Sequence, residues 1–317
     1  MEYFVLSFNV ISPIIIITML GYFLKKKSVI SDEFTEKVTY IIFKISIPAL
    51  LFNKITSLKV DLSLNQVQRN FIIYTGLVLI LVYLIIELSA KIFIKDIKTR
   101  GTYVQGSIRS NYIFIGYPVL LSLFGDEVVF PMILLTLVSL PIFNVTAILT
   151  LTINNPKVKG VDVRELLKNI FTNPIILSII IGFLWSILSF PVPQFLSKTF
   201  ELVGDVSTPM ALIVIGSMFV VNTKGRLNLP LVFTVLNKNI FLPIIFTTAA
   251  AYLGFRGVYL GTIFLIFAAP SSTTSFIMAK AMDSNYSLAA NIVLASTALS
   301  SLVIFIGIVI LKYSNLI

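Results

Sequence analysis

Long runs of apolar residues without a charged side chain restrict the fold of this chain more than any other feature. A helix needs about 20 apolar residues to cross the hydrocarbon core of a bilayer. Four charge-free runs meet this length, at 4–24, 128–153, 170–197 and 285–311. Six further segments are similar but carry polar, proline or glycine positions, at 34–56, 70–94, 101–124, 199–222, 228–253 and 257–280. We therefore predict an all-α membrane protein with ten transmembrane helices.

The composition argues against several classes of function. The 317 residues are 57% hydrophobic and 12% charged, whereas soluble domains are about 25% charged. The chain has no Cys and no His, so thiol nucleophiles, imidazole bases and the usual zinc ligands are missing. We expect no enzyme, no metal site and no cofactor. The net charge of +10 comes from Lys and Arg spread between apolar runs, so we expect no nucleic-acid partner.

The distribution of Lys and Arg predicts the orientation in the membrane. Alternate connections hold 13 of these residues on one side and 6 on the other. Because an excess of Lys and Arg marks the cytoplasmic side, we predict a multi-pass protein of the plasma or cytoplasmic membrane with both termini outside. The first apolar run has no basic segment before it and no small-residue cleavage site after it. We therefore expect a true span there and not a removable signal peptide.

The two halves of the chain share an internal repeat. Ser12-Pro13-Ile14-Ile15 and Gly21 recur as Asn173-Pro174-Ile175-Ile176 and Gly182, 161 positions later. The same offset relates a Ser-x-Pro ending at Pro48 to one ending at Pro209. One offset maintained across two pairs of prolines favours duplication over chance apolar similarity.

The repeat predicts how the chain is organised. We expect a first five-helix repeat at 1–153, a short basic cytoplasmic linker at 154–172 and a second repeat at 173–317. Since five is odd, the second copy enters the bilayer from the opposite side, and the repeats are inverted. Inverted repeats are typical of transporters that alternate access around a site near the midplane. Two alternative interpretations remain: a duplication without mechanistic meaning, and a channel.

Two of the predicted spans carry polar residues and proline deep in the bilayer. The fourth contains Ser107-Ile108-Arg109-Ser110-Asn111 followed by Gly116 and Pro118, and the ninth contains residues 268–275, Ala-Ala-Pro-Ser-Ser-Thr-Thr-Ser. We predict that both helices are broken, because proline removes a backbone donor. Half-helix N-termini would favour an anionic substrate. The alternative is that Ser and Thr bond carbonyls of their own helix. The predicted substrate-binding residues are Arg109, Ser110, Asn111, Gly116, Pro118, Pro270, Ser271, Ser272, Thr273 and Thr274.

These motifs resemble the crossover region of the auxin efflux carrier family, which includes the plant PIN carriers. The resemblance rests on N-x4-G-x-P from Asn111 to Pro118 and on Ala268-Ala269-Pro270 with Phe276 and Ala279-Lys280. It implies a fold like that of bile acid:sodium symporters, with helices 1, 2, 6 and 7 as scaffold and 3–5 and 8–10 as transport domain. It also implies that Asn111 binds a substrate carboxylate and that the scaffold forms a homodimer. Ser110 departs from the family, since plant carriers have proline there.

Four ionisable residues at membrane depth call for an explanation. Lys44 and Asp205 are repeat mates near Pro48 and Pro209, and we predict that they pair and brace the scaffold. Glu87 and Lys238 lie at similar depth in the third and eighth spans, where a coupling role competes with snorkelling towards the headgroups.

The preferred interpretation is a secondary transporter of small organic anions, such as auxin-like acids or dicarboxylates, with an elevator mechanism. The first alternative is a sodium-coupled symporter of the bile acid type, which should show a cluster of carboxylate and amide ligands in the transport domain. Only Glu87 lies there at depth. A channel or receptor that uses the same fold is the second alternative.

Overall fold

The computed structural model describes residues 12–13, 16–17, 19–57, 64–155, 164, 172, 174–188, 190–218 and 229–317, and these are almost entirely helical. The chain forms two compact units. The larger unit lies within Gln66–Leu166 and Asn222–Ile317, and the smaller within Ser12–Asn65 and Leu167–Val221. Each unit therefore draws on both halves of the sequence. Most of the predicted linker at 154–172 and the start of the first predicted span lie outside the described residues.

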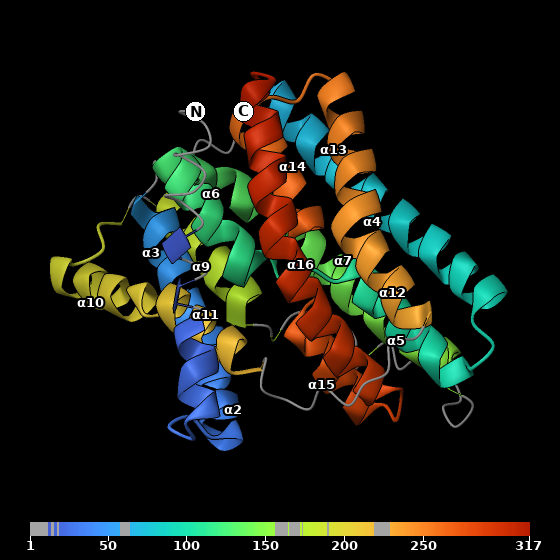
Figure 1. Ribbon diagram of the computed structural model, residues 1–317. Helices are drawn as coiled ribbons and strands as arrows, with labels where there is room; N and C mark the ends of the chain where they lie inside the picture. The colour runs from blue at the N-terminus through green and yellow to red at the C-terminus, as the bar shows by residue number, and fades with distance from the viewer. Residues whose placement is uncertain are drawn as a thin grey trace. The chain divides into compact units, whose positions relative to one another are not determined.

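The larger unit holds the long helices. Its elements are α4 (Gln66–Phe93), α5 (Ile97–Ile108), η2 (Tyr112–Gly116), α6 (Tyr117–Phe124), η3 (Gly125–Val128), α7 (Val129–Ile153), α12 (Leu229–Leu236), η4 (Asn237–Phe241), α13 (Leu242–Tyr252), α14 (Gly257–Ala268), α15 (Thr273–Ala281) and α16 (Tyr286–Tyr313). Helices α4, α5 and α7 pack against one another, and α16 lies along α12, α14 and α15 (Figure 1). The chain turns sharply after α6 at Gly125, whose φ of 59° and ψ of −148° suit only glycine.

The smaller unit consists of two matching helical segments. Its elements are α2 (Asp32–Ile41), η1 (Ile42–Ser46), α3 (Ile47–Ser57), α9 (Pro174–Ile187), α10 (Gln194–Asp205) and α11 (Ser207–Met218). Helix α3 packs against both α9 and α10. The ends of α3 and α11, Ser57 and Met218, are 161 residues apart, which is the offset of the sequence repeat. The inversion of the repeats stays a prediction.

Five helical stretches in the described part of the chain are long and apolar enough to cross a membrane. They are Asp32–Ser57, Gln66–Phe93, Tyr117–Ile153, Leu229–Tyr252 and Tyr286–Tyr313, with shorter apolar helices at Pro174–Ser186 and Gly257–Ala268. The full set of ten spans stays a prediction. One predicted boundary was wrong: the run 170–197 does not continue as one helix, because α9 ends at Ile187 and α10 begins at Gln194, after Pro191 and Pro193.

Three π-helical turns interrupt the α-helices, and each ends two residues before a proline. They are η1 before Pro48, η2 before Pro118 and η4 before Pro243. The residue preceding each proline donates its amide to the carbonyl five positions back, as Tyr117 does to Tyr112. Proline has no amide of its own and its ring crowds the carbonyl four positions back, so the wider turn adjusts the hydrogen-bond register without ending the helix.

Close helix contacts in the smaller unit explain the repeated glycines. A Cβ added to Gly21 would lie 2.1 Å from the backbone oxygen of Ile213 in α11, so only glycine fits there. A Cβ at its repeat mate Gly182 would lie 3.2 Å from Cβ of Ile55 in α3. Small residues allow such close approach of helices within membranes. The helical residues around Gly21 thus contact α11, while α9, which contains Gly182, contacts α3.

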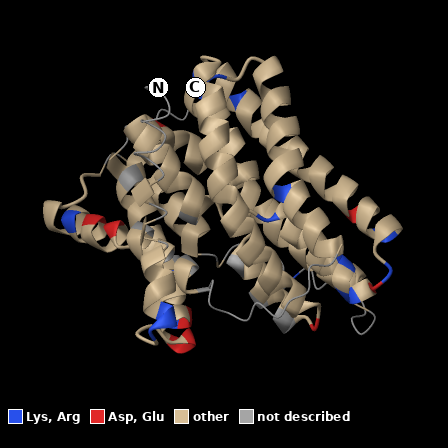
Figure 2. Ribbon diagram, in the orientation of Figure 1, with Lys and Arg blue, Asp and Glu red and all other residues tan. Residues whose placement is uncertain are grey.

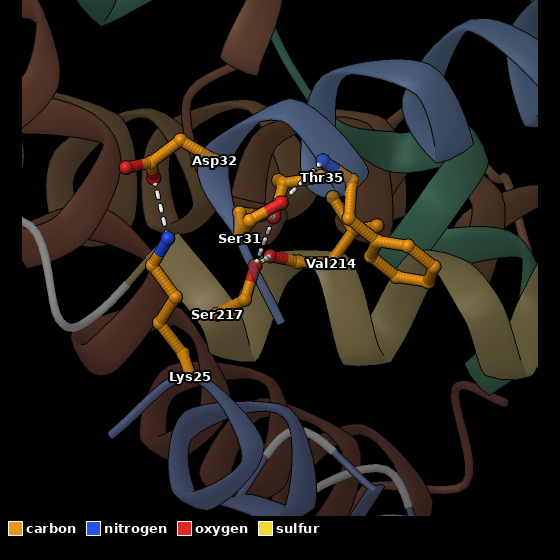
Figure 3. Close-up of polar contacts among 7 residues, drawn as sticks. Lys25, Ser31, Asp32, Thr35, Val214 and Ser217 are labelled. Atoms are coloured by element: carbon orange, nitrogen blue, oxygen red, sulfur yellow. Dashed lines mark hydrogen bonds and ion pairs between the residues drawn. The ribbon is translucent and has the colours of Figure 1, made fainter. Parts of the chain in front are cut away.

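Polar contacts fix the start of α2 in the same unit (Figure 3). The Ser31 side chain caps α2 by accepting from a first-turn amide, and the Thr35 hydroxyl donates to the Ser31 carbonyl at 3.0 Å. Thr35 Oγ1 also lies 3.1 Å from Ser217 Oγ of α11. Lys25 Nζ pairs with Asp32 Oδ1 at 2.6 Å at the exposed end of this segment. Of these contacts, the one between Thr35 and Ser217 joins the two halves of the chain within the smaller unit.

Many charged residues lie near helix ends and loops (Figure 2), while the middle of α16 carries none. Lys44 and Asp205 are both exposed, and no ion pair between described residues joins them. The predicted brace between these repeat mates is therefore not formed in this structure.

Candidate functional site

The fourth and ninth predicted spans are both broken, and their breaks are short extended segments. Helix α5 ends at Ile108 and the chain is extended at Arg109, with φ −65° and ψ 135°, before η2 begins at Tyr112. Helix α14 ends at Ala268, and Ala269 is extended with φ −62° and ψ 148° before α15 begins at Thr273. Each break therefore leaves one half-helix C-terminus and one half-helix N-terminus in the larger unit.

The two extended segments pair with each other. Ser110 and Ser271 form an isolated antiparallel bridge, and the Asn111 amide donates to the Pro270 carbonyl at 2.8 Å. Ser110 and Ser271 are also 161 residues apart, so the bridge joins repeat mates. A twofold relation between the repeats would place mates opposite each other in this way. We call residues 109–111 and 269–272 the crossover.

Side chains from two helices, α16 and η4, satisfy backbone groups in and beside the second segment. The amide of Ser271 donates to Ser296 Oγ of α16 at 3.0 Å. Lys238 Nζ donates to the Ile266 carbonyl at 3.1 Å, and Asn239 Nδ2 donates to the Ala268 carbonyl at 3.3 Å. Both residues come from η4 and reach the C-terminal end of α14, where the helix dipole favours positive charge. Lys238 is fully buried, so its ammonium stabilises the broken end of α14.

Arg109 brings a positive charge into the first segment. Its side chain is only 6% exposed, and its Nη1 donates to the thioether sulfur of Met278 at 2.8 Å. Its Nε is buried without a hydrogen-bond partner, and no acidic residue in the described ranges pairs with it. A buried guanidinium without an anion is costly, and a thioether is a weak acceptor. The site therefore favours an anion close to Arg109.

Other polar groups near the crossover also lack partners. The Asn111 side chain is 7% exposed, and its side-chain amide makes no hydrogen bond to any residue that the structure describes. Buried side-chain atoms without a partner in this region are Gln105 Oε1, Ser107 Oγ, Ser110 Oγ, Ser271 Oγ and Ser275 Oγ. Buried polar groups are normally satisfied, so this concentration indicates a site for a polar ligand or for water.

The structure brings some of the predicted residues together and separates others. Arg109, Ser110 and Asn111 meet Pro270, Ser271 and Ser272 at the crossover. Ser272 Oγ lies 2.7 Å from Thr274 Oγ1, so these hydroxyls satisfy each other within one segment. The side chain of Thr273 lies outside the described ones.

Gly116 and Pro118 are not in the break, although the proline rule suggested that the helix would unwind there. Gly116 packs beside Leu265 of α14, where an added Cβ would lie 3.4 Å from Cβ of Leu265. Pro118 is in the first turn of α6, and η2 absorbs its missing donor. The break lies at the polar residues 109–111 instead, because their backbone pairs with the other segment.

Several residues of the site were missed by sequence reasoning. Gln105 Nε2 donates to the Ser275 carbonyl at 3.1 Å and so joins α5 to α15. Gln105 and Asn239 are polar residues inside apolar segments and could have been noticed on that ground. Met278 and Ser296 carry no such signal, since one is apolar and the other lies among many serines of α16.

Glu87 and Lys238 do not pair with each other. Glu87 of α4 accepts from Thr150 Oγ1 at 2.6 Å and from Asn154 Nδ2 at 3.1 Å. No ion pair among the described residues includes either group. The two ionisable groups thus belong to separate clusters. The described ranges also contain no group of three His, Cys, Asp or Glu residues that could hold a metal ion.

Comparison with protein families identifies the family of the chain. The family model for membrane transport proteins matches residues 6–308. The chain belongs to this family. The match covers nearly the whole chain and confirms the predicted relation to auxin efflux carriers. No curated protein matches the chain in a direct comparison. As a member of a membrane transport protein family with several apolar helices, the chain is an integral membrane transporter.

Proposed function

We propose that this transporter carries small organic anions and binds their carboxylate at the crossover. The observation that carries the proposal is Arg109, a buried cation without an acidic partner among the described residues, two positions from Asn111, whose side-chain amide makes no hydrogen bond to them. In this proposal both side chains contact one ligand, since Arg109 and Asn111 lie on either side of the bridged Ser110. Guanidinium and amide donors together match the two oxygens of a carboxylate.

The groups at the site would favour a carboxylate over a neutral solute. A planar guanidinium forms paired hydrogen bonds with a carboxylate, and burial strengthens such bonds relative to water. The substrate charge would also balance the charge of Arg109. Auxin-like acids and dicarboxylates both meet this requirement, and the shape of the remaining ligand decides between them.

The division of the chain into two compact units supports an elevator mechanism. The crossover lies wholly within the larger unit, while the smaller unit carries close glycine contacts that suit a rigid scaffold. In this proposal helices 1, 2, 6 and 7 form the scaffold, which also forms a homodimer, and the larger unit moves the substrate across the membrane with alternating access. Both termini face outward, as the Lys and Arg distribution predicts.

The sodium-coupled alternative receives less support. A sodium site requires several oxygen ligands, usually including carboxylates. The crossover residues that the structure describes contribute hydroxyls and amides but no carboxylate. A channel or receptor would be recognised by flux that does not saturate, or by binding without flux.

The test is uptake of radiolabelled carboxylates into proteoliposomes that contain the purified protein, with and without pH and sodium gradients. The panel includes monocarboxylates, dicarboxylates, indole acids and a neutral amide analogue of each. Saturable uptake that needs the carboxylate and is lost in Asn111→Ala supports the proposal. Equal uptake of the amide analogues, or no saturable uptake of any acid, would overturn it.

A further inference from the structure

Glu87 is a buried carboxylate that the proposed substrate site does not use. It lies in α4, six residues before the end of the helix at Phe93, and is 7% exposed. At 1.5 Å per residue this places it about 9 Å from the helix end. An ionisable side chain inside a membrane segment costs free energy and is by default a functional candidate.

The partners of Glu87 are neutral. One carboxylate oxygen accepts from Thr150 Oγ1 at 2.6 Å and the other from Asn154 Nδ2 at 3.1 Å, both at the C-terminal end of α7. Asn154 Nδ2 also donates to the Thr150 carbonyl at 2.9 Å. A carboxylate that is permanently charged in such a place would be expected beside a cation. The described residues provide none.

The network fits either protonation state of Glu87. When the side chain is ionised, the Thr150 hydroxyl donates to it, as the structure has it. When it is protonated, its own hydroxyl can donate to Thr150 Oγ1, because a threonine oxygen also accepts. Asn154 is the C-cap of α7. The cluster therefore lies at the end of this helix.

The titratable groups on the neighbouring helices are engaged elsewhere or point away. On α4, Lys91 is exposed and Tyr83 lies one turn before Glu87. On α5, the Lys98 ammonium pairs with Asp283, Arg100 Nε donates to the Ile94 carbonyl, and Asn237 Nδ2 donates to the Tyr103 hydroxyl. Helix α7 has no titratable side chain. Tyr83 and Lys91 are thus the titratable groups one turn from Glu87 on its own helix, and neither forms an ion pair or hydrogen bond with it in the described part; Tyr83 is neutral at ordinary pH.

We propose that Glu87, Thr150 and Asn154 form a proton-binding site of the larger unit. The Glu87 carboxylate takes one proton from water to become a carboxylic acid and later returns it, with no other bond made or broken. Because the site and the crossover belong to the same compact unit, the proton moves with the substrate, which makes transport respond to a pH gradient. This coupling rests on the proposed function, whereas proton binding itself does not.

Infrared difference spectroscopy tests the proton site without any substrate. The carbonyl stretch of a buried protonated carboxylic acid is recorded as the pH of the purified protein is changed. The wild type and Glu127→Gln, which alters an exposed glutamate of the same unit, should give one band that Glu87→Gln lacks. If the band persists in Glu87→Gln, or if the wild type has none, the proton site is overturned. If Glu87→Gln does not fold, Thr150→Val is measured instead. The band of Glu87 in this variant should titrate at higher pH, because the ionised carboxylate loses the hydroxyl that donates to it.

Gradient-driven uptake tests the coupling separately. In proteoliposomes one coupled proton supports about a tenfold accumulation of substrate per pH unit. Glu87→Gln should lose this accumulation but retain exchange of labelled for unlabelled substrate. Unchanged accumulation in Glu87→Gln would overturn the coupling. A wild type with the infrared band but no saturable uptake would leave the proton site standing and reject the proposed substrate function.

Discussion

The two segments of the crossover have the same backbone arrangement but different chemistry. Both are short extended breaks between half-helices, and their central serines, Ser110 and Ser271, face each other. The first segment presents Arg109 and Asn111, whose polar groups lack full partners. The second has Pro270, and its flanking backbone groups are satisfied by Lys238 and Ser296. The repeat therefore provides the geometry, while the first segment provides the groups that we propose select a ligand.

The two buried cations differ in the same way. The Lys238 ammonium has a backbone acceptor at the end of α14, so it serves the fold. The Arg109 guanidinium has only a thioether, so it is available to an anion. This contrast separates substitutions that should destroy the protein from those that should leave it folded but inactive.

The largest effect is expected for Lys238→Glu. A buried carboxylate would then face the carbonyl end of α14, where both the helix dipole and desolvation oppose it. We expect a loss of about 3–5 kcal/mol in stability and no monodisperse peak in size-exclusion chromatography. Lys238→Arg keeps the charge and should give a folded protein. A folded, active Lys238→Glu protein would show that the second segment does not depend on this cation.

Arg109→Gln should produce the next largest effect, and on binding instead of folding. Loss of a buried charged contact to the substrate costs about 3 kcal/mol, or about 100-fold in Kd. The measurement is the concentration dependence of uptake, with the thermal melting of the protein as a folding control. Pro270→Ala alters the repeat mate and should change Kd less than about threefold. Equal effects at both positions would mean that the two segments are chemically equivalent.

Asn111→Ala and Ser272→Ala compare the next pair of repeat mates. The Asn111 side-chain amide makes no hydrogen bond with the described residues, whereas the Ser272 hydroxyl has Thr274. Losing a hydrogen bond to a charged ligand costs about 1.5–3 kcal/mol, so Asn111→Ala should weaken binding at least about tenfold. Ser272→Ala should weaken it only slightly. The measurement is the ratio of the KM values of the two variants, and a ratio near one would contradict the difference between the two segments.

The smallest effect is expected for Ser296→Ala, which acts on the fold of the second segment. The Ser271 amide would lose its acceptor and remain buried, at a cost of about 1–2 kcal/mol. We expect a decrease in Tm of a few degrees in differential scanning fluorimetry with unchanged KM. Ser301→Ala, on the same helix but away from the crossover contact, is the matched control. A large change in KM would assign Ser296 to the ligand.

The sequence predicted the broken helices but not where the first one breaks. The sequence shows polar residues around the break from residue 107 onwards. Because proline disrupts helices, however, the break was predicted to extend to Pro118, where the chain is helical. The π-helical turn before Pro118 tolerates the proline, whereas the break itself is stabilised by pairing with a segment 161 residues away. Backbone pairing of this kind leaves little trace in local sequence.

Ionisable residues were found easily, but their partners were not. The repeat suggested that Lys44 would meet Asp205, yet equivalence in sequence does not imply proximity, and both side chains are exposed. Glu87 and Lys238 instead have hydroxyl, amide and carbonyl partners on other helices. Neutral partners of this kind occur throughout an apolar chain, so charge complementarity alone cannot identify them.

Because the bridge at the crossover is made by the backbone, the crossing of the two segments can be kept during evolution while the side chains of the site change. Its hydrogen bond joins the Asn111 amide to the Pro270 carbonyl, so the pairing uses no side-chain atom. Substitutions at positions 109, 111 and 272 can therefore alter the charge, size and donors of the site while the crossing of the two segments is retained. A lineage that inherits this arrangement can acquire new cargo by a few point mutations, without rebuilding the helices that surround it.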